Sequence, residues 1–199
     1  MKYYQIGNQS LPSVTTILAA TKDPDKTAQL KKWEKKMQQI HGENGAEIER
    51  NKAMERGTKI HQEINNYLLN QTEIESPLAQ KLIPFLKLIQ KKLIYAEKTV
   101  WTNQYAGTLD CLCKYEELTT LIDWKTSNTI KRKDWIEDHF IQAAAYAQAT
   151  KHCHNIQTEQ TLIVIISPQK IQQFSEQGAA IKVRENQFNE RLEAFNALS

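Results

Sequence analysis

Two apolar segments of the chain carry charged residues whose types and spacing suit a metal-binding site. Residues 107–113 and 121–127 both read as β-strands, because apolar side chains surround a few charges. Alternate side chains of a strand share a face, so Asp123 and Lys125 point the same way. A hairpin joining the two segments would bring Asp110 beside Asp123. Two carboxylates with a lysine beside them suit Mg²⁺ or Mn²⁺ and the hydrolysis of a phosphodiester.

The same charges have a simpler explanation, which is a structural ion pair. An Asp-x-Lys sequence occurs in many proteins, and an exposed ion pair on an edge strand usually accounts for it. Here the flanking residues are apolar, so the charges would lie in a largely buried strand, where an unpaired charge is costly. Two carboxylates held close together also require a cation. These points favour the metal site.

The composition indicates a globular protein with one core. The chain has 199 residues, 40% hydrophobic and 25% charged, and a net charge of +3 that permits an anionic partner. No apolar run approaches the roughly 20 residues needed to span a bilayer. The N-terminus shows no presequence, and 3 cysteines fit a reducing compartment. We therefore expect a cytoplasmic protein.

Hydrophobic periodicity predicts helices on either side of a small sheet. We expect a hairpin in residues 1–10, a helix capped by Ser13 at 14–20, and helices at 26–40, 47–69 and 77–92. The pattern then predicts strands at 93–102, 106–116 and 119–126, a helix at 134–152, strands at 161–167 and 179–183, and a helix at 188–198. This order predicts a single α/β domain over residues 1–199.

Several motifs together resemble one superfamily of nucleases. Gly107…Asp110, the run Asp123-Trp124-Lys125-Thr126-Ser127 and Gln142-x-x-x-Tyr146 are similar to the PD-(D/E)XK nuclease superfamily, in its RecB-like branch. Residues 11–18, Trp33 and Arg56-Gly57-Thr58-x-x-His61 narrow the resemblance to the family of mitochondrial genome maintenance exonucleases and their bacterial and phage relatives. The resemblance extends over residues 11–149, although the proline that precedes the second carboxylate in the family pattern is absent.

The resemblance implies a fold, an activity and a cofactor. The fold would be restriction-endonuclease-like, with a small mixed central sheet flanked by helices; residues 1–92 would form a helical arch around a DNA channel, and residues 93–199 the catalytic part. The activity would be that of a metal-dependent deoxyribonuclease, an exonuclease on single-stranded DNA with free ends, using Mg²⁺ or Mn²⁺. Two alternatives remain: a structure-specific flap endonuclease, and a nuclease-like DNA-binding module without catalysis.

The resemblance also implies roles for the charged residues. Asp110, Asp123, the backbone carbonyl of Trp124 and His61 would bind the metal ion, and imidazole favours Mn²⁺ over Mg²⁺. Lys125 would position the attacking water or help to deprotonate it. From the sequence alone, a surface histidine on an amphipathic helix would be the preferred explanation of His61.

Three further residues could support catalysis. In this branch a glutamate such as Glu97 often supports the active site, but Glu97 could equally be an ordinary strand charge beside Lys98. Gln142 and Tyr146 lie four residues apart on one helix face, where they would orient the catalytic residues and the strand end. The alternative for this pair is a plain helix–sheet contact with a buried tyrosine.

Hydroxyl and basic residues supply candidate DNA contacts. They could bind phosphates, or serve only as helix caps and solvated charges; the predicted contacts are Ser13, Thr15, Thr16, Thr126, Ser127, Lys131, Arg132 and Lys133. Trp33 lies on the apolar stripe of its helix, so we expect it in the core rather than stacked on a base. Cys111 and Cys113 cannot easily wrap one tetrahedral metal, so we expect buried free thiols rather than a zinc site.

Overall fold

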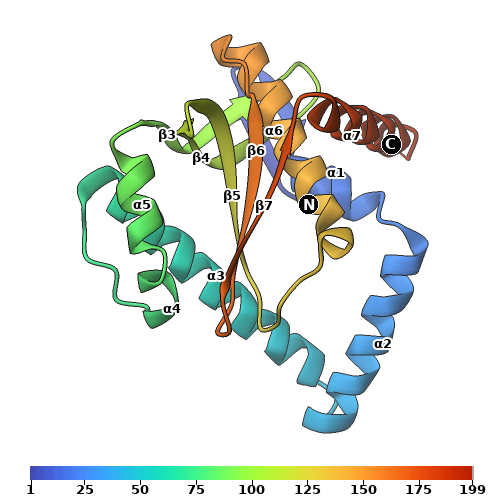
Figure 1. The fold of residues 1–199 in the computed structure, drawn as a ribbon. Coiled ribbons are helices and arrows are strands. Elements are labelled where there is room, and N and C mark those ends of the chain that lie inside the picture. Colours follow the sequence, from blue (N-terminus) through green and yellow to red (C-terminus); the bar gives the residue numbers. More distant parts are fainter. Residues whose placement is uncertain (199) are drawn as a thin grey trace.

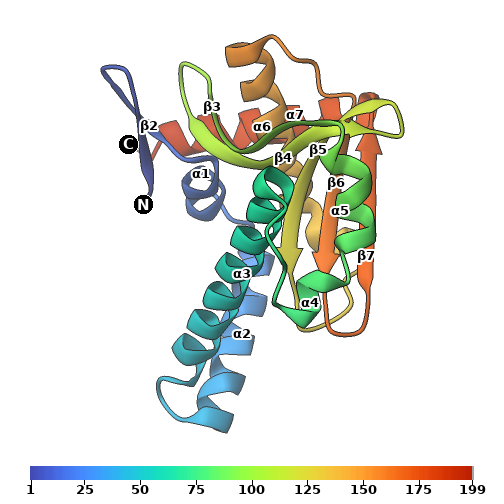
Figure 2. The ribbon, with the colours of Figure 1, turned by 90° about the vertical axis from the view of Figure 1, so that its left-hand side faces the viewer.

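A five-stranded sheet separates two helical layers in the computed structural model (Figures 1 and 2). Residues 1–198 are described; Ser199, the last residue of the predicted domain, and the side chains of Lys26 and Gln29 lie outside the description. The strands follow the order β3-β4-β5-β6-β7, and their bounds are Leu93–Trp101, Ala106–Tyr115, Leu118–Thr126, Gln160–Ile166 and Ile171–Gln177. Only β5 and β6 are parallel, joined through α6 (Glu137–His154). The predicted mixed sheet flanked by helices is confirmed.

The helical N-terminal half also follows the prediction closely. This half begins with a hairpin of β1 (Tyr3–Ile6) and β2 (Gln9–Pro12). The helices that follow are α1 (Val14–Ala20), α2 (Pro24–His41), α3 (Gly45–Asn70), α4 (Pro77–Gln80) and α5 (Ile83–Gln90). The predicted helix at 77–92 is therefore divided. Pro84 lies in the first turn of α5, where its missing N–H costs nothing.

Each face of the sheet packs against a different set of helices. Leu121, Ile163 and Ile165 share a core with α1, α6 and α7 (Ala179–Asn196). Ile122 and Trp124 share a second core with α3, α4 and α5. Because both faces are covered, every residue of β6 is buried, as is usual for a strand with a parallel neighbour between two helical layers. Cys111 and Cys113 are buried free thiols in the second core, as predicted.

The predicted strand at 179–183 is wrong, because these residues form the first turn of α7. Its apolar residues continue at helical spacing, with Ile181, Phe188 and Leu192 buried on one side. The fifth strand is β7, whose sequence IQQFSEQ is mostly polar. As an edge strand it needs few apolar residues, so its pattern did not indicate a strand.

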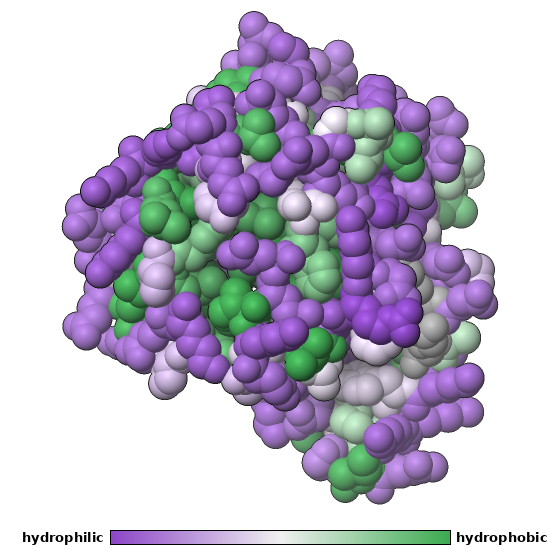
Figure 3. Space-filling view, viewed as in Figure 1, coloured by the Kyte–Doolittle hydropathy of each residue, from purple (hydrophilic) through white to green (hydrophobic). Residues whose placement is uncertain are grey.

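Helices α2 and α3 form a hairpin that extends well beyond the end of the sheet (Figure 2). Trp33 is only half-buried and belongs to neither core, contrary to the prediction, because it lies in this hairpin rather than under the sheet. Ile40 and Ile48, on either side of the turn, are 56% and 45% exposed, and hydrophobic atoms show at this lower tip in Figure 3. Among residues 1–198, no helix has the length and hydrophobicity of a membrane span.

Candidate active site

The two predicted carboxylates lie side by side on β4 and β5. Cys111 pairs with Ile122, so the next position of this antiparallel ladder places Asp110 beside Asp123. Oδ2 of Asp110 accepts a hydrogen bond of 2.8 Å from the backbone N–H of Trp124. The carboxylate of Asp110 is thus fixed across the ladder. The Trp124 side chain itself is buried on the opposite face, and its carbonyl remains only a predicted metal ligand.

Asp123 and Lys125 share one face of the sheet, as their spacing predicted. This is the face that packs against α6, and the two side chains form an ion pair there. Nζ of Lys125 donates to Oδ1 of Asp123 at 2.8 Å and lies 2.7 Å from Oδ2. Asp123 is 1% exposed, and its Oδ2 makes no hydrogen bond to any described residue. Burial raises the pKa of Asp123 to about 6, although Lys125 opposes the shift. Because Nζ of Lys125 lies against both oxygens, the lysine ammonium supplies the cation that this buried carboxylate requires.

His61, Glu97 and Asp110 form a second cluster from three different elements. Their ligand atoms all lie within 4.8 Å of one another, and Nδ1 of His61 is 3.5 Å from Oδ1 of Asp110. Burial opposes the charge on each member of this pair. Even so, the interaction between the two residues lowers the pKa of the Asp110 carboxyl below its ordinary value. The same interaction raises the pKa of the His61 imidazole above its ordinary value. One imidazole and two carboxylates form a donor set that fits Mn²⁺ or Mg²⁺.

Glu97 reaches this cluster through an unusual backbone conformation. It lies in the middle of β3 with φ of 48°, between residues that pair with Leu109 and Cys111 of β4. A left-handed non-glycine residue inside a strand is strained, and such strain clusters at functional sites. Burial, followed by the charge of Asp110, raises the pKa of the Glu97 carboxyl. Glu97 is therefore part of the acidic cluster rather than an ordinary strand charge.

Gln142 and Tyr146 close the site from α6. Nε2 of Gln142 donates to the Tyr146 hydroxyl at 3.1 Å, and the tyrosine is 4% exposed. The ring lies against Gly107, where an added Cβ would come within 2.3 Å of Cε1 of Tyr146. Burial raises the pKa of Tyr146, and the charges of Asp123 and Asp110 add to the shift. Glycine at position 107 therefore allows the phenol to approach both carboxylates.

The predicted phosphate contacts at the start of α1 are largely internal. Ser13 and Thr16 are buried, and Oγ of Ser13 accepts from the Thr16 N–H at 3.0 Å and donates to its Oγ1 at 2.9 Å. Thr15 is exposed and lies 3.0 Å from the same Ser13 hydroxyl. Of the three, only Thr15 has a side chain open to a ligand.

The other predicted DNA contacts lie along the segment that leaves β5. Lys133 is 3.6 Å from Glu176, and Arg132 pairs with Asp134 at 3.0 Å. Lys131 is held through its backbone, whose N–H donates to Gln172 at 2.8 Å. The Ser127 hydroxyl donates to Thr129, whereas Thr126 lies near Gly57 of α3. These residues are ordered around the strand end, and several are engaged within the protein.

A groove of about 640 Å³ adjoins the acidic cluster and contains residues that the sequence did not indicate. His61 and Glu97 form part of its wall, and the further lining residues are Lys2, Gly57, Thr58, Gln62 and Asn65. Asn65 follows His61 by four residues on α3, so helical spacing alone could have suggested it. For Lys2 the sequence carries no such signal.

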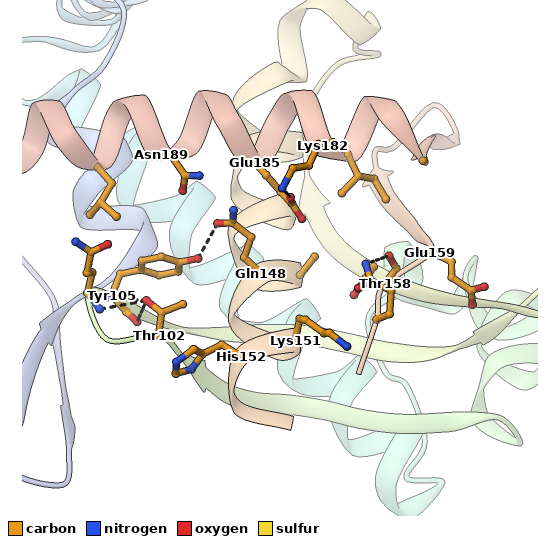
Figure 4. Close-up of a pocket in the computed structure, with 16 residues that line it drawn as sticks. Thr102, Tyr105, Gln148, Lys151, His152, Thr158, Glu159, Lys182, Glu185 and Asn189 are labelled. Atoms are coloured by element: carbon orange, nitrogen blue, oxygen red, sulfur yellow. Dashed lines mark hydrogen bonds and ion pairs between the residues drawn. The ribbon is translucent and has the colours of Figure 1, made fainter. Parts of the chain in front are cut away.

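A separate cavity of about 790 Å³ lies between α6 and α7 (Figure 4). Gln148 of α6 accepts a hydrogen bond from Tyr105 at 3.1 Å, and Lys182 of α7 is bonded to Glu185 at 2.9 Å. None of the predicted catalytic or DNA-binding residues lines this cavity. It is larger than the groove beside His61.

Sequence comparison identifies relatives of this chain. It is 30% identical over 173 residues to mitochondrial genome maintenance exonuclease 1 of Xenopus tropicalis, covering 80% of this chain and 49% of the relative. The chain resembles the nuclease superfamily of these enzymes. The enzyme of the same name from Mus musculus is 28% identical, and the match covers 78% of this chain and 49% of that relative. The Homo sapiens enzyme is also 28% identical, and the match covers 78% of this chain and 48% of that relative. The resemblance predicted from the motifs is thus confirmed. The chain spans about half the length of the curated relatives it matches.

Structural comparison gives more distant matches. The crystal structure of SSO0001 has a TM-score of 0.44 and 14% identity, with 94% of this chain and 78% of that chain covered. An alkaline exonuclease from Laribacter hongkongensis has a TM-score of 0.37 and 16% identity, with 73% and 72% covered. No protein-family model matches the chain. At these scores no function is inferred from the structural neighbours.

Proposed function

We propose that this protein is a metal-dependent deoxyribonuclease that degrades single-stranded DNA from a free end. The observation that carries the proposal is the convergence of the two carboxylates, Lys125 and the cluster of His61 and Glu97 at one site. Helix α3 and the three consecutive strands β3, β4 and β5 supply these groups. The relatives are named exonucleases, which supports the same class of reaction.

A divalent cation fits the donor set of this site. His61, Glu97 and Asp110 would hold it, with Asp123 and the Trp124 carbonyl as further predicted ligands. When bound, Mg²⁺ or Mn²⁺ would neutralise charge on the scissile phosphate and lower the pKa of a coordinated water. The side chains around the phosphate would stabilise charge and position the substrate.

Lys125 would stabilise the charge that develops on the phosphate. Both oxygens of Asp123 lie within 2.8 Å of its ammonium group, so the cation is held in one place. A preorganised charge in a site closed to water stabilises a transition state better than a mobile one does. The geometry favours this role for Lys125 over that of a general base.

Tyr146 and Gln142 would orient the strand end. Because the tyrosine hydroxyl accepts from Gln142, its own O–H is free to donate toward a phosphate oxygen. The ring also covers the carboxylates from the α6 side, which limits access of water. Both residues would therefore position substrate rather than exchange protons with it.

The arrangement of grooves supports the choice of single-stranded ends. The groove of about 640 Å³ contains His61, and another of about 440 Å³, lined by Thr15, Lys22, Leu30 and Gln142, lies on the α6 side. A flexible strand could run through both grooves and pass the hairpin of α2 and α3. A stiff duplex is poorly suited to such a path.

A flap endonuclease would use the same chemistry, so it is the main alternative. A DNA-binding module without catalysis is disfavoured by the intact set of Asp110, Asp123 and Lys125. The test is digestion of end-labelled linear single strands and blunt duplexes with Mg²⁺, Mn²⁺ or EDTA. We expect metal-dependent loss of the single strand well ahead of the duplex. Equal digestion in EDTA would contradict the proposal.

A further inference from the structure

Lys2 extends the active site from an element far away in sequence. It lines the groove beside His61 and Glu97, whereas the rest of that groove comes mainly from α3. A cation at this position lies close to the path of any phosphate that reaches the acidic cluster.

The backbone of Lys2 is fixed by the start of α1. Its N–H donates to Oγ1 of Thr16 at 2.9 Å, and its carbonyl accepts from the Ser13 N–H at 2.9 Å and from Oγ1 of Thr16 at 3.2 Å. Two of the three hydroxyl residues that the sequence suggested as phosphate ligands here, Ser13 and Thr16, therefore hold Lys2. Their buried hydroxyls act inside the protein and not on a ligand.

The side chain of Lys2 is exposed and available. Its Nζ lies 4.8 Å from the centre of the Tyr4 ring, and the Tyr4 hydroxyl is 3.0 Å from Oγ1 of Thr108 on β4. Among residues 1–198, no carboxylate forms an ion pair with Lys2. The ring thus supports the ammonium group and leaves its N–H donors free.

The same groove carries amide side chains. Gln62 follows His61 directly on α3, Asn65 lies four residues after it, and both line this space. The NH₂ group of each amide can donate a hydrogen bond to a phosphate oxygen. Neutral donors together with one cation are typical of a site that binds the DNA backbone without reading bases.

We propose that Lys2, with Gln62 and Asn65, forms a subsite for one backbone phosphate of the DNA strand, adjacent to the phosphate that is cleaved. Ser13 and Thr16 are positioning residues for Lys2. The subsite rests on the proposed nuclease function, because its ligand is the substrate of that reaction. It takes a phosphodiester of either a substrate or a product strand.

The first test measures how binding depends on salt. A fluorescent single-stranded oligonucleotide is titrated in Ca²⁺, an ion chosen to allow binding while slowing cleavage, with any affinity tag at the C-terminus. Losing one phosphate contact should reduce the slope of log K against log [salt] by about 0.7 for Lys2→Gln. Lys91→Gln, an exposed change at the end of α5, should keep the wild-type slope.

The second test locates the phosphate. Single uncharged methylphosphonates are placed at successive positions of the oligonucleotide. Wild-type protein should lose affinity at one position near the cleavage site, and Lys2→Gln should be insensitive at that same position. Thr16→Val should reproduce the loss and Thr16→Ser should restore it, with thermal unfolding confirming that each variant is folded.

The outcomes separate the subsite from the function. If wild-type protein binds and cleaves DNA but Lys2→Gln keeps the wild-type slope and methylphosphonate profile, the subsite is wrong and the nuclease proposal stands. If wild-type protein neither binds nor cleaves DNA, both are wrong. A changed slope with an unchanged positional profile would show general charge attraction, and would also overturn the subsite.

Discussion

The central sheet and the hairpin of α2 and α3 differ in how deeply their side chains are buried. Strands β4, β5 and β6 lie between two cores, and the acidic side chains are held among buried neighbours. The hairpin has its own contact between α2 and α3, but none of the described residues of α2 is buried. An exposed ion pair of 2.6 Å between Arg50 and Glu34 is part of what joins the two helices.

Under the proposed function, this difference predicts separate roles for the two regions. Groups that must stabilise a transition state need fixed positions, which strands packed on both sides provide. A surface that receives strands of any sequence needs little rigidity, and weakly buried elements have low local stability. Chemistry should therefore depend on the sheet, and the choice of DNA ends on the hairpin.

The largest expected effect is the loss of cleavage when the sheet residues change. Asp110→Asn, Asp123→Asn and Lys125→Met should each reduce the cleavage rate by about 10³-fold or more, the upper range for losing one charge-stabilising group. Single-turnover digestion of a labelled single strand measures the rate. Glu117→Gln, in the exposed turn between β4 and β5, is the control. A near-normal rate in any of the three would remove that residue from the mechanism.

The second prediction compares two tryptophans, one from each region. Trp124→Ala should cost about 3–5 kcal/mol of unfolding free energy, because it leaves a cavity in a closed core. Trp33→Ala, in the half-buried hairpin contact, should cost about 1 kcal/mol, near the average for a single substitution. Urea denaturation of the metal-free protein measures both. Equal costs would show that the hairpin is as tightly packed as the sheet.

The third prediction concerns His61, which links the two regions because α3 belongs to both. If the imidazole is a ligand, His61→Ala should weaken the apparent Mn²⁺ affinity by about 10–100-fold, the range seen when metal sites lose a supporting group. Activity measured against Mn²⁺ concentration gives the affinity. Asn66→Ala, an exposed change on the same helix outside the groove, is the control for metal affinity. An unchanged Mn²⁺ dependence would return His61 to the role of a surface histidine.

The fourth prediction concerns the pH dependence of stability. The folded-state pKa of Asp123 is raised to about 6 from an ordinary value of 3.8, so its protonated form is the one that folding favours. Its contribution to stability is present at pH values below 3.8 and is lost as the pH rises through about 6. In EDTA, the wild type should therefore lose stability relative to Asp123→Asn between these values. A constant difference across this range would contradict the burial of an ionisable Asp123.

Much of the sheet could be predicted because its strands carry their own pattern. Residues 107–113 and 121–127 are apolar runs with a few charges, and the spacing of Asp123 and Lys125 placed both on one face. Strand β7 was missed because an edge strand with glutamines has no apolar period. Trp33 was misplaced because helical periodicity cannot distinguish a core from a contact between two exposed helices.

The site was only partly accessible from the sequence. The pair of Asp110 and Asp123 followed from strand pairing, which is local. The approach of Glu97 depends on a left-handed backbone at one position of β3, and no residue type predicts that conformation for glutamate. The position of Lys2 depends on tertiary contacts with Ser13 and Thr16. Both features arise from the packed chain.

The most direct measurement compares a linear single-stranded DNA with a covalently closed circle of the same sequence. Both are incubated with wild-type protein and with Asp123→Asn in Mn²⁺. If the sheet residues catalyse cleavage and the hairpin allows only DNA ends to reach them, the wild type should degrade the linear strand and leave the circle intact. The variant should degrade neither. Rapid cutting of the circle by the wild type, or normal digestion by the variant, would contradict this account.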